Sequence, residues 1–519
     1  MTATTLTAGA STAGDGLLFD GAEWDFETVR RVYAAIETIA RDDLGLDVYP
    51  NQIEIISAEQ MLDAYSSVGM PLMYAHWSYG KRFVRDEVLY RKGYQALAYE
   101  IVINSNPCIS YCMEENTMAM QTVVIAHAAF GHNHFFKNNY LFQQWTDAGG
   151  ILDYLDFAKR YVAGCEELHG VEAVESTLDA AHALMGQGVF RYPRAAKLKL
   201  AEYERRRREK LERETREYRD LWRTVPGAAA APSADLSEEE ARERKRRLRL
   251  PEENLLYFLE KNSPALRDWQ RELLRIVRNL AQYFYPQQQT KLMNEGCATF
   301  VHYAIVNRLY DKGLISEGAL LEILHSHANV VTQFDFDDKH YGGINPYALG
   351  FAMMRDIQRI CVAPTDEDRE WFPEIAGRED WCAVLRDVWA NYRDESFVRQ
   401  FLSPRLIRKF RLFALSNNAS ESSVRVEAIH DAEGYRGVRS ALADSYDVSA
   451  NEPNIQIVDV NLLGDRPLIL RHTVRNGVRL AEADREATLR HIGRLWGGEV
   501  RLEETPIVSM PDLTAPARH

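Results

Sequence analysis

The chain has 519 residues, of which 46% are apolar and 27% charged, the balance of a globular protein with a sizeable core. Its net charge of −14 argues against a general nucleic-acid binder, which is normally basic. No apolar run approaches the ~18 residues that a membrane span needs, and the six scattered cysteines favour buried thiols in a reducing cytoplasm over a disulfide framework.

The first elements are predicted from periodicity. Residues 1–20 lack the basic and apolar regions of a signal peptide and predict a disordered tail. Apolar residues at helical spacing predict a helix over 24–44, and alternation predicts a strand at 49–57. A second strand is expected within ALAYEIVINSNP, which is rich in β-branched residues and ends at Pro107.

Residues 114–140 are helical by period and contain the stretch IAHAAFGHNHFFKNN. The stretch is similar to the HExxH helix of zinc peptidases, but His127 and His132 are five residues apart and Ala128 stands where the base would be. Residues five apart lie about 140° apart around an α-helix, so a π-bulge is needed to bring both rings to one ion. His134 lies two turns beyond His127, too far away to share that ion.

A two-histidine site needs a further ligand, and MNEGCATFVHY provides one. Glu295 opens an apolar helix there and completes a candidate site for a divalent cation, zinc for preference, with His127 and His132. The alternative is that each histidine is a hydrogen-bonded core residue, and the sequence leaves both interpretations open.

The catalytic base must come from another element, because Ala128 cannot supply it. Glu115 is the preferred candidate, and Glu100 on the predicted strand is a second available carboxylate. His302 and His325 are candidates for contacts with the metal ligands or with a substrate, as is Glu100; ordinary packing is the competing interpretation for both histidines.

The second half of the chain changes character twice. Residues 198–250 alternate Arg and Glu closely, which predicts a solvated, charged helical insertion rather than a basic arm. Apolar helices resume at 273–284, 291–311 and 317–331. Over 415–506 the predicted order is strand, helix, strand, strand, helix, strand, which is the order of the ferredoxin-like split unit.

Several long stretches resemble the stage V sporulation protein R (SpoVR) family. They are PNQIEIISAEQMLDAYSSVGMP, HWSYGKRF, YEIVINSNPCISYCMEENTMAMQ, AHAAFGHNHFFKNNYLF, MNEGCATFVHY and YGGINPYALGF. The resemblance implies a role in spore cortex formation or in a stationary-phase stress response. It also implies as partners a serine protein kinase of the AAA type and a von Willebrand-type domain protein. His127 and His132 match the family motif, whereas His134 is expected to vary.

These observations predict a mostly helical α+β protein. Its zincin-like main domain is expected over 21–405, a small ferredoxin-like domain over 415–506 and a tail over 507–519. Glu295 resembles the second-helix glutamate of gluzincin-type peptidases, and a strand before the histidine helix follows the zincin order. One hypothesis is a metal-dependent hydrolase of protein or peptidoglycan-type peptides. The other is a non-catalytic regulator that binds partner proteins of the kinase pathway.

Overall fold

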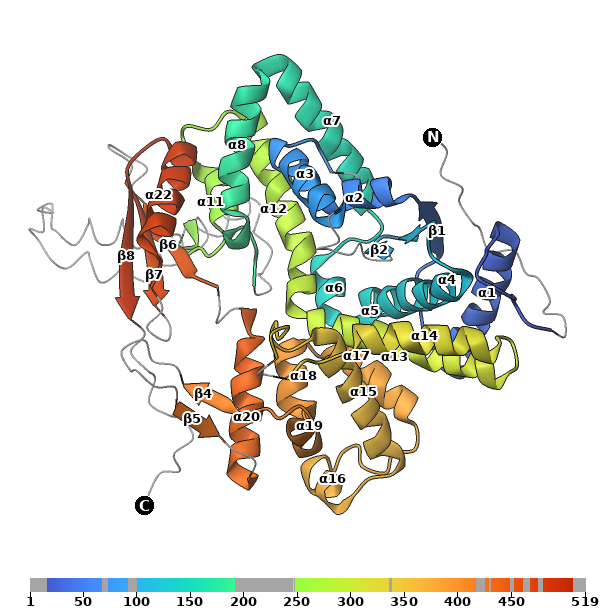
Figure 1. Cartoon of the computed structure of the whole chain (residues 1–519). Helices are drawn as coiled ribbons and strands as arrows, with labels where there is room; N and C mark the ends of the chain where they lie inside the picture. Colours follow the sequence, from blue (N-terminus) through green and yellow to red (C-terminus); the bar gives the residue numbers. More distant parts are fainter. Residues whose placement is uncertain are drawn as a thin grey trace, which may run out of the picture. The chain divides into compact units, whose positions relative to one another are not determined.

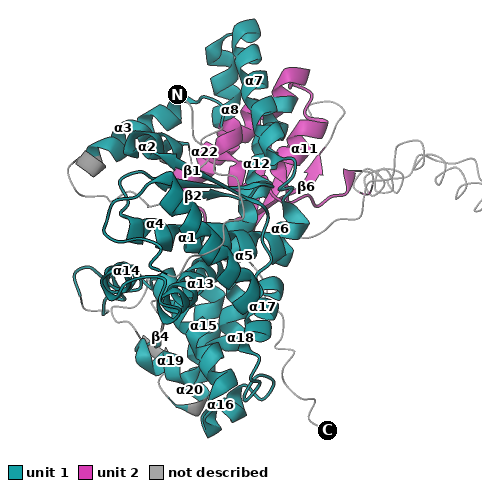
Figure 2. Ribbon diagram, turned by 90° about the vertical axis from the view of Figure 1, so that its right-hand side faces the viewer, with its two compact units in different colours: residues 1–179, 272–452 teal, residues 180–271, 453–519 magenta. Residues whose placement is uncertain are grey.

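The computed structural model describes residues 16–67, 73–91, 100–191, 246, 248–335, 338–416, 425–428, 431–448, 452–460, 467–474 and 479–506. They form a mostly helical α+β protein, as predicted. The chain divides into two compact units, coloured separately in Figure 2: residues 1–179 with 272–452, and residues 180–271 with 453–519.

Helices dominate the first unit (Figure 1). Its first half contains α1 (Phe26–Thr38), the π-helix η1 (Ile39–Asp43), β1 (Asn51–Ile56), α2 (Ala58–Ser66), α3 (Trp77–Arg91), β2 (Glu100–Ile103), β3 (Cys108–Met113), α4 (Met118–Ile125), the π-helix η2 (Ala126–His132), α5 (Asn133–Asn138), α6 (Tyr140–Trp145), α7 (Ile151–His169) and most of α8 (Val171–Ala183). Its second half contains most of α12 (Asp268–Gln289), then α13 (Lys291–Asp311), α14 (Glu317–Val330), α15 (Pro346–Val362), α16 (Asp366–Trp371), α17 (Trp381–Asn391), α18 (Asp394–Phe401), α19 (Pro404–Lys409), β4 (Ala414–Ser416), β5 (Arg425–Ala428) and α20 (Ala432–Ser445).

A three-stranded sheet of order β1-β3-β2 lies beside η2. The central strand β3 runs parallel to β1 and antiparallel to β2, and Glu100 is paired with Cys112 in the register of β2 and β3. Five of the six residues of β3 are buried, as is usual for a central strand covered on both faces. The sheet therefore brings the start of β2 close to the histidine helix.

Small residues let α13 pass closely between η2 and α15. A Cβ atom on Gly131 would lie 2.5 Å from Cα of Ala298, and one on Gly296 would lie 2.6 Å from the backbone carbonyl carbon of Gly350. Neither contact is tolerable, so both glycines are required by the close approach of the helices. This packing holds the start of α13 against the π-helical turn.

Part of the predicted N-terminal tail is packed in the core. Leu18 and Phe19 are buried, and the backbone N–H of Leu18 donates to the carbonyl oxygen of Leu314. The prediction of a disordered tail over 1–20 is therefore wrong for these residues, whose apolar side chains fill the core beside α13. Residues 1–15, almost all of the charged insertion at 198–250 and the tail at 507–519 lie outside the described residues.

The second unit contains η3 (Met185–Gln187), α11 (Leu255–Asn262) and a sheet of order β6-β7-β8, with β6 (Asn454–Val460), β7 (Leu468–Val474), β8 (Val500–Pro506) and α22 (Glu482–Trp496). β6 and β7 are antiparallel, whereas β7 and β8 are parallel. Trp496 at the end of α22 is fully buried and its ring contacts that of Phe258 on α11. This aromatic contact anchors the helix within its own unit.

The strand and helix predicted to begin a βαββαβ domain are placed differently. β5 pairs with β4 in a separate two-stranded sheet, and α20 packs on α18 in the first unit. Val438 and Ala443 of α20 belong to the hydrophobic core of that unit. The apolar face of α20 is therefore used by the main core, and among the described residues only β6, β7, α22 and β8 form the small C-terminal unit with α11 and η3.

Candidate metal centre

A π-helical turn brings the two predicted histidine ligands together. In η2 the hydrogen bonds run from residue i to i+5, so residues five apart lie over one another. The rings of His127 and His132 have centroids 4.6 Å apart and are nearly perpendicular, at 88°. The predicted insertion in the helix is confirmed, and it is what places both imidazoles on one side.

Two carboxylates from other elements face these imidazoles. On α13, Oε2 of Glu295 lies 3.7 Å from Nε2 of His132 and 4.0 Å from Nε2 of His127. On β2, Oε1 of Glu100 lies 3.6 Å from Nε2 of His127. One ligand atom each of Glu100, His127 and His132 lie within 4.8 Å of one another. Both histidines are buried, and the side chains of Glu100 and Glu295 are only 20% and 16% exposed.

Hydrogen bonds fix which nitrogen of each ring faces the carboxylates. Nδ1 of His132 lies 2.9 Å from Oδ1 of Asn294, an amide oxygen that can only accept. This contact is satisfied when Nδ1 of His132 donates, and in the neutral ring Nε2 then carries the lone pair on the side of Glu295. This is the tautomer that a metal-ligating histidine adopts, with its second nitrogen donating to a neighbouring oxygen.

His127 is held by a chain of two more histidines. Nδ1 of His127 lies 3.0 Å from Nδ1 of His302, and Nε2 of His302 lies 2.9 Å from Nδ1 of His327. When His127 donates from Nδ1, His302 donates in turn from Nε2 to His327, and Nε2 of His127 keeps its lone pair. One consistent assignment of protons along the chain thus leaves both imidazoles ready to bind a cation.

The electrostatics of the centre favour a cation. Burial lowers the pKa of His127 well below its usual range, and the nearby His132 and His302 lower it further, so the ring is neutral. Burial, and then the charge of Glu295, raises the pKa of Glu100 to about 8. Oε2 of Glu295 is buried and has no hydrogen-bond partner among the described residues. Two imidazole nitrogens and two carboxyl groups thus face one another, and a divalent cation such as zinc would favour the charged form of Glu100 and occupy the unpartnered Oε2 of Glu295.

The structure does not bring Glu115 to this centre, contrary to the role predicted for it. Glu115 is exposed, and its Oε1 accepts from the backbone N–H of Ala58 at the start of α2. It follows the end of β3, where the chain turns outward before α4, so its carboxylate acts at a helix N-terminus. The carboxylates at the centre are Glu100 and Glu295.

His325 also lies away from the centre. It is exposed on α14, and its Nε2 lies 3.4 Å from Nδ2 of Asn329 on the same helix. His134 is buried, as a structural residue would be, with Nδ1 2.9 Å from the carbonyl oxygen of Asp47. Of the predicted residues, the structure therefore brings together His127, His132, Glu295, Glu100 and His302.

Asn294 was not predicted as part of the centre, and of the two neighbouring candidates His325 and His327 on α14 only His325 was selected from the sequence. On α14 the buried residues Ala319, Ile323 and His327 are four residues apart, whereas His325 lies off that stripe. This period was the available signal that His327 faces inward. Asn294 directly precedes Glu295, but nothing in the sequence indicates that it contacts the histidine helix.

Comparison with known proteins identifies the family of the chain. The sequence profile described as "SpoVR like protein" matches residues 23–451, and the profile "SpoVR-like C-terminal domain" matches residues 453–506. The chain belongs to the SpoVR family. The boundary between the two matches coincides with the start of the last segment of the second unit at 453.

A relative from Escherichia coli (strain K12) is "Uncharacterized protein YcgB". It is 52% identical to this SpoVR-family chain over 487 residues, which cover 94% of each protein. No solved structure matches the chain. In the part of the chain that the structure describes, no helix combines the length and apolar character that crossing a membrane requires.

Proposed function

We propose that the first unit holds a divalent cation, zinc for preference, and acts as a metal-dependent hydrolase. His127, His132 and Glu295 are its proposed ligands. The observation that carries the proposal is the meeting of two imidazole Nε2 atoms with a buried carboxylate oxygen that has no hydrogen-bond partner among the described residues. A cation bound there supplies Lewis-acid polarisation of a substrate carbonyl and lowers the pKa of water.

The protein's own residues have separable roles in this proposal. Asn294 and His302 hold protons on the outer nitrogens of the two ligand rings and so keep their Nε2 lone pairs available. Glu100 takes the role of proton acceptor that the sequence suggested for Glu115, because it lies 3.6 Å from His127.

The substrate class rests on the zincin-like interpretation and on the family. An antiparallel strand beside the histidine helix is where zincin-type peptidases hold an extended peptide, and β2 occupies such a position next to η2. We propose a protein or a peptidoglycan-type peptide as substrate, in a cytoplasmic role in spore cortex formation or in a stationary-phase stress response.

Metal analysis of the purified full-length chain tests this function. We expect one tightly held divalent cation per chain, lost in His132→Ala and Glu295→Gln and retained in the matched control His325→Ala, which changes an exposed histidine. Peptide hydrolysis should disappear with the cation and return when it is restored. Wild-type protein that contains no zinc, iron or manganese and takes up none of them rules the proposal out.

A regulatory function without catalysis is the second candidate, and Ala128 favours it. This residue is fully buried and stands where HExxH helices carry their base. In this case the protein would act by binding a serine protein kinase of the AAA type and a von Willebrand-type domain protein, with the charged insertion as docking arm. Pull-down with and without residues 200–250 tests the arm, since loss of the insertion should release a partner; full retention contradicts it.

A further inference from the structure

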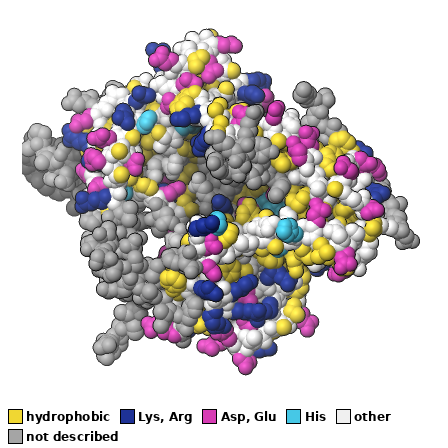
Figure 3. Space-filling model, in the orientation of Figure 1, with side chains coloured by type: hydrophobic (Ala, Val, Ile, Leu, Met, Phe, Trp, Pro, Cys, Tyr) yellow, Lys and Arg dark blue, Asp and Glu magenta, His cyan; other side chains and the backbone are white. Residues whose placement is uncertain are grey.

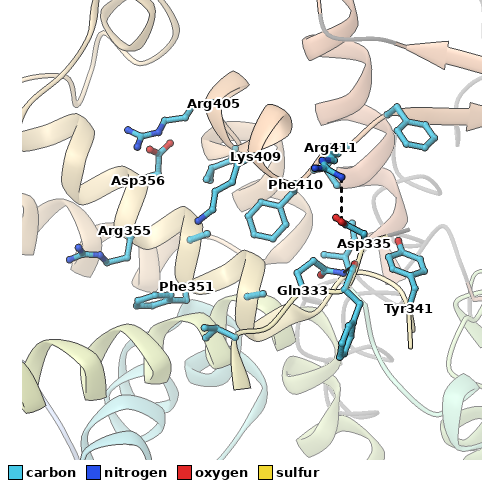
Figure 4. Close-up of a pocket in the computed structure, with 18 of the residues that line it drawn as sticks. Gln333, Asp335, Tyr341, Phe351, Arg355, Asp356, Arg405, Lys409, Phe410 and Arg411 are labelled. Carbon is cyan, nitrogen blue, oxygen red and sulfur yellow. Dashed lines mark hydrogen bonds and ion pairs between the residues drawn. The ribbon is translucent and has the colours of Figure 1, made fainter. Parts of the chain in front are cut away.

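A cavity of about 970 Å³ lies within the first unit, outside the candidate metal centre. It is bounded by α15, α19 and the segments that follow α14 and α19 (Figure 4). Its volume is at the upper end of the ~300–1,000 Å³ typical of small-molecule sites. Lys and Arg side chains gather low on the face shown in Figure 3, in the region where Figure 1 draws α15 and α19.

The acidic groups that line this cavity are already neutralised. Asp335 forms an ion pair of 3.3 Å with Arg411, drawn as a dashed line in Figure 4. Asp356 is buried, pairs with Arg359 at 2.8 Å and accepts a hydrogen bond from Ser403. It shares Arg359 with Asp368, which pairs with the same guanidinium at 2.6 Å. Both carboxylates are thus used inside the protein, and neither can balance the remaining cations of the wall.

Three cations of the wall have no such partner. Arg355, Arg405 and Lys409 are exposed and form no ion pair in the part of the chain that the structure describes. Arg355 donates to Oε1 of Gln358 and lies over the ring of Tyr303 at 5.1 Å, contacts that hold the guanidinium without reducing its charge. The lining residues comprise five cations and two carboxylates, and Asp368 behind the wall also pairs with Arg359, so an excess of two positive charges remains in a chain of net charge −14.

Aromatic and aliphatic side chains form the rest of the wall. Phe351 of α15 and Phe410 after α19 lie on opposite sides of the space in Figure 4. Phe351 also contacts His327, with ring centroids 4.8 Å apart. Phe351 therefore lies between the cavity and the last of the three linked histidines. An occupant of the cavity would therefore touch a residue that packs directly against that chain.

We infer that this cavity binds a small molecule that carries both a phosphate chain and a planar ring, the chemistry of a nucleoside diphosphate. A diphosphate ester carries roughly three negative charges at neutral pH, and Arg355, Arg405 and Lys409 are three cations that form no ion pair among the described residues and can contact it. Arginine binds phosphate oxygens through two parallel hydrogen bonds, and lysine adds a point charge. The ring packs against the aromatic wall, where face-to-face and edge contacts are both available.

Titration calorimetry of the full-length chain with ADP, pyrophosphate and adenosine tests the inference. We expect ADP to bind, and Arg355→Gln and Lys409→Gln each to weaken binding about tenfold, as loss of a charge-assisted hydrogen bond does. Lys159→Gln, which removes an exposed lysine of α7, is the matched control and should leave affinity unchanged. Adenosine should bind at least about tenfold more weakly than ADP, because it lacks the phosphates.

Three outcomes overturn the inference. One is absence of ADP binding at millimolar concentration. Another is binding that the Arg355 and Lys409 variants leave intact, which puts the nucleotide elsewhere. The third is pyrophosphate binding as tightly as ADP, which removes the role of the aromatic wall. None of these results depends on a metal at His127 and His132, so they are distinguishable from a failure of the proposed hydrolase.

Discussion

The substitution Gly131→Ala tests whether the close packing of η2 on α13 outweighs the higher helix propensity of alanine. The added methyl carbon would lie 2.5 Å from Cα and 2.8 Å from Cβ of Ala298, where ordinary carbon contacts are about 3.5–4.0 Å. Backbone atoms cannot rotate away, so η2 and α13 must separate by roughly 1 Å. Such overpacking costs about 1–3 kcal/mol and outweighs the gain of about 1 kcal/mol that Ala brings over Gly in a helix.

The same displacement moves His132 away from Glu295. Metal–ligand distances tolerate only about ±0.2 Å, so we expect at least a tenfold loss of zinc affinity, measured by competition with a chromophoric chelator. Urea unfolding followed by circular dichroism measures the stability change. Gly164→Ala in α7 is the control, because its Cβ meets nothing within 4 Å, and it should be stabilising. If Gly131→Ala is equally stabilising and keeps its zinc affinity, the argument from close packing is refuted.

Three further predictions concern the supports of the centre and of the fold. Asn294→Ala removes the acceptor for His132 and should weaken zinc binding about 10–100-fold in the same chelator competition. Asp394→Ala leaves two buried N–H groups of the first turn of α13 without acceptors and should cost about 1–3 kcal/mol in urea unfolding. Burial raises the pKa of Asp368, but hydrogen bonds from Arg359 outweigh this and lower it to about 2, below the ordinary 3.8. Its stabilisation is thus full above pH 3.8 and lost toward pH 2, so the stability difference between wild type and Asp368→Asn should shrink over that range.

The proximity of His127 and His132 could be predicted because it depends on local spacing. A five-residue spacing of histidines is incompatible with one face of an α-helix, and η2 is the distortion that this spacing demands. Glu295 could be predicted because it opens an apolar helix, where a lone carboxylate is costly unless it has a partner. These inferences required no knowledge of which strands or helices are neighbours.

The sequence did not identify the correct residue among nearby candidates, because tertiary contacts decide which side chain faces the centre. His325 and His327 are two residues apart on α14, so they face about 160° apart, and only the buried stripe distinguishes them. Glu115 follows a strand whose end directs it to α2 and away from η2. The direction in which each of these side chains points does not follow from the type of residue.

Strand pairing could be predicted least. β3 is buried on both faces, so it lacks the alternation that identifies a half-exposed strand, and it was not predicted as an element. β5 and α20 read in order as the start of the C-terminal domain, yet the apolar face of α20 completes the core of the first unit. A correct order of elements does not determine which sheet each strand joins.

The π-helical turn also explains why a carboxylate is absent from the position after the first histidine. Ala128 is completely buried in η2, so a glutamate there would lose its hydration without reaching solvent. The inserted residue that aligns the two histidines thus makes that position unsuitable for a base. Carboxylates approach from β2 and α13, where Glu100 and Glu295 keep part of their surface in water. A hydrolase built on this centre therefore takes its base from another element, such as Glu100 of β2, whereas a regulator needs no base and leaves Ala128 as a buried core residue.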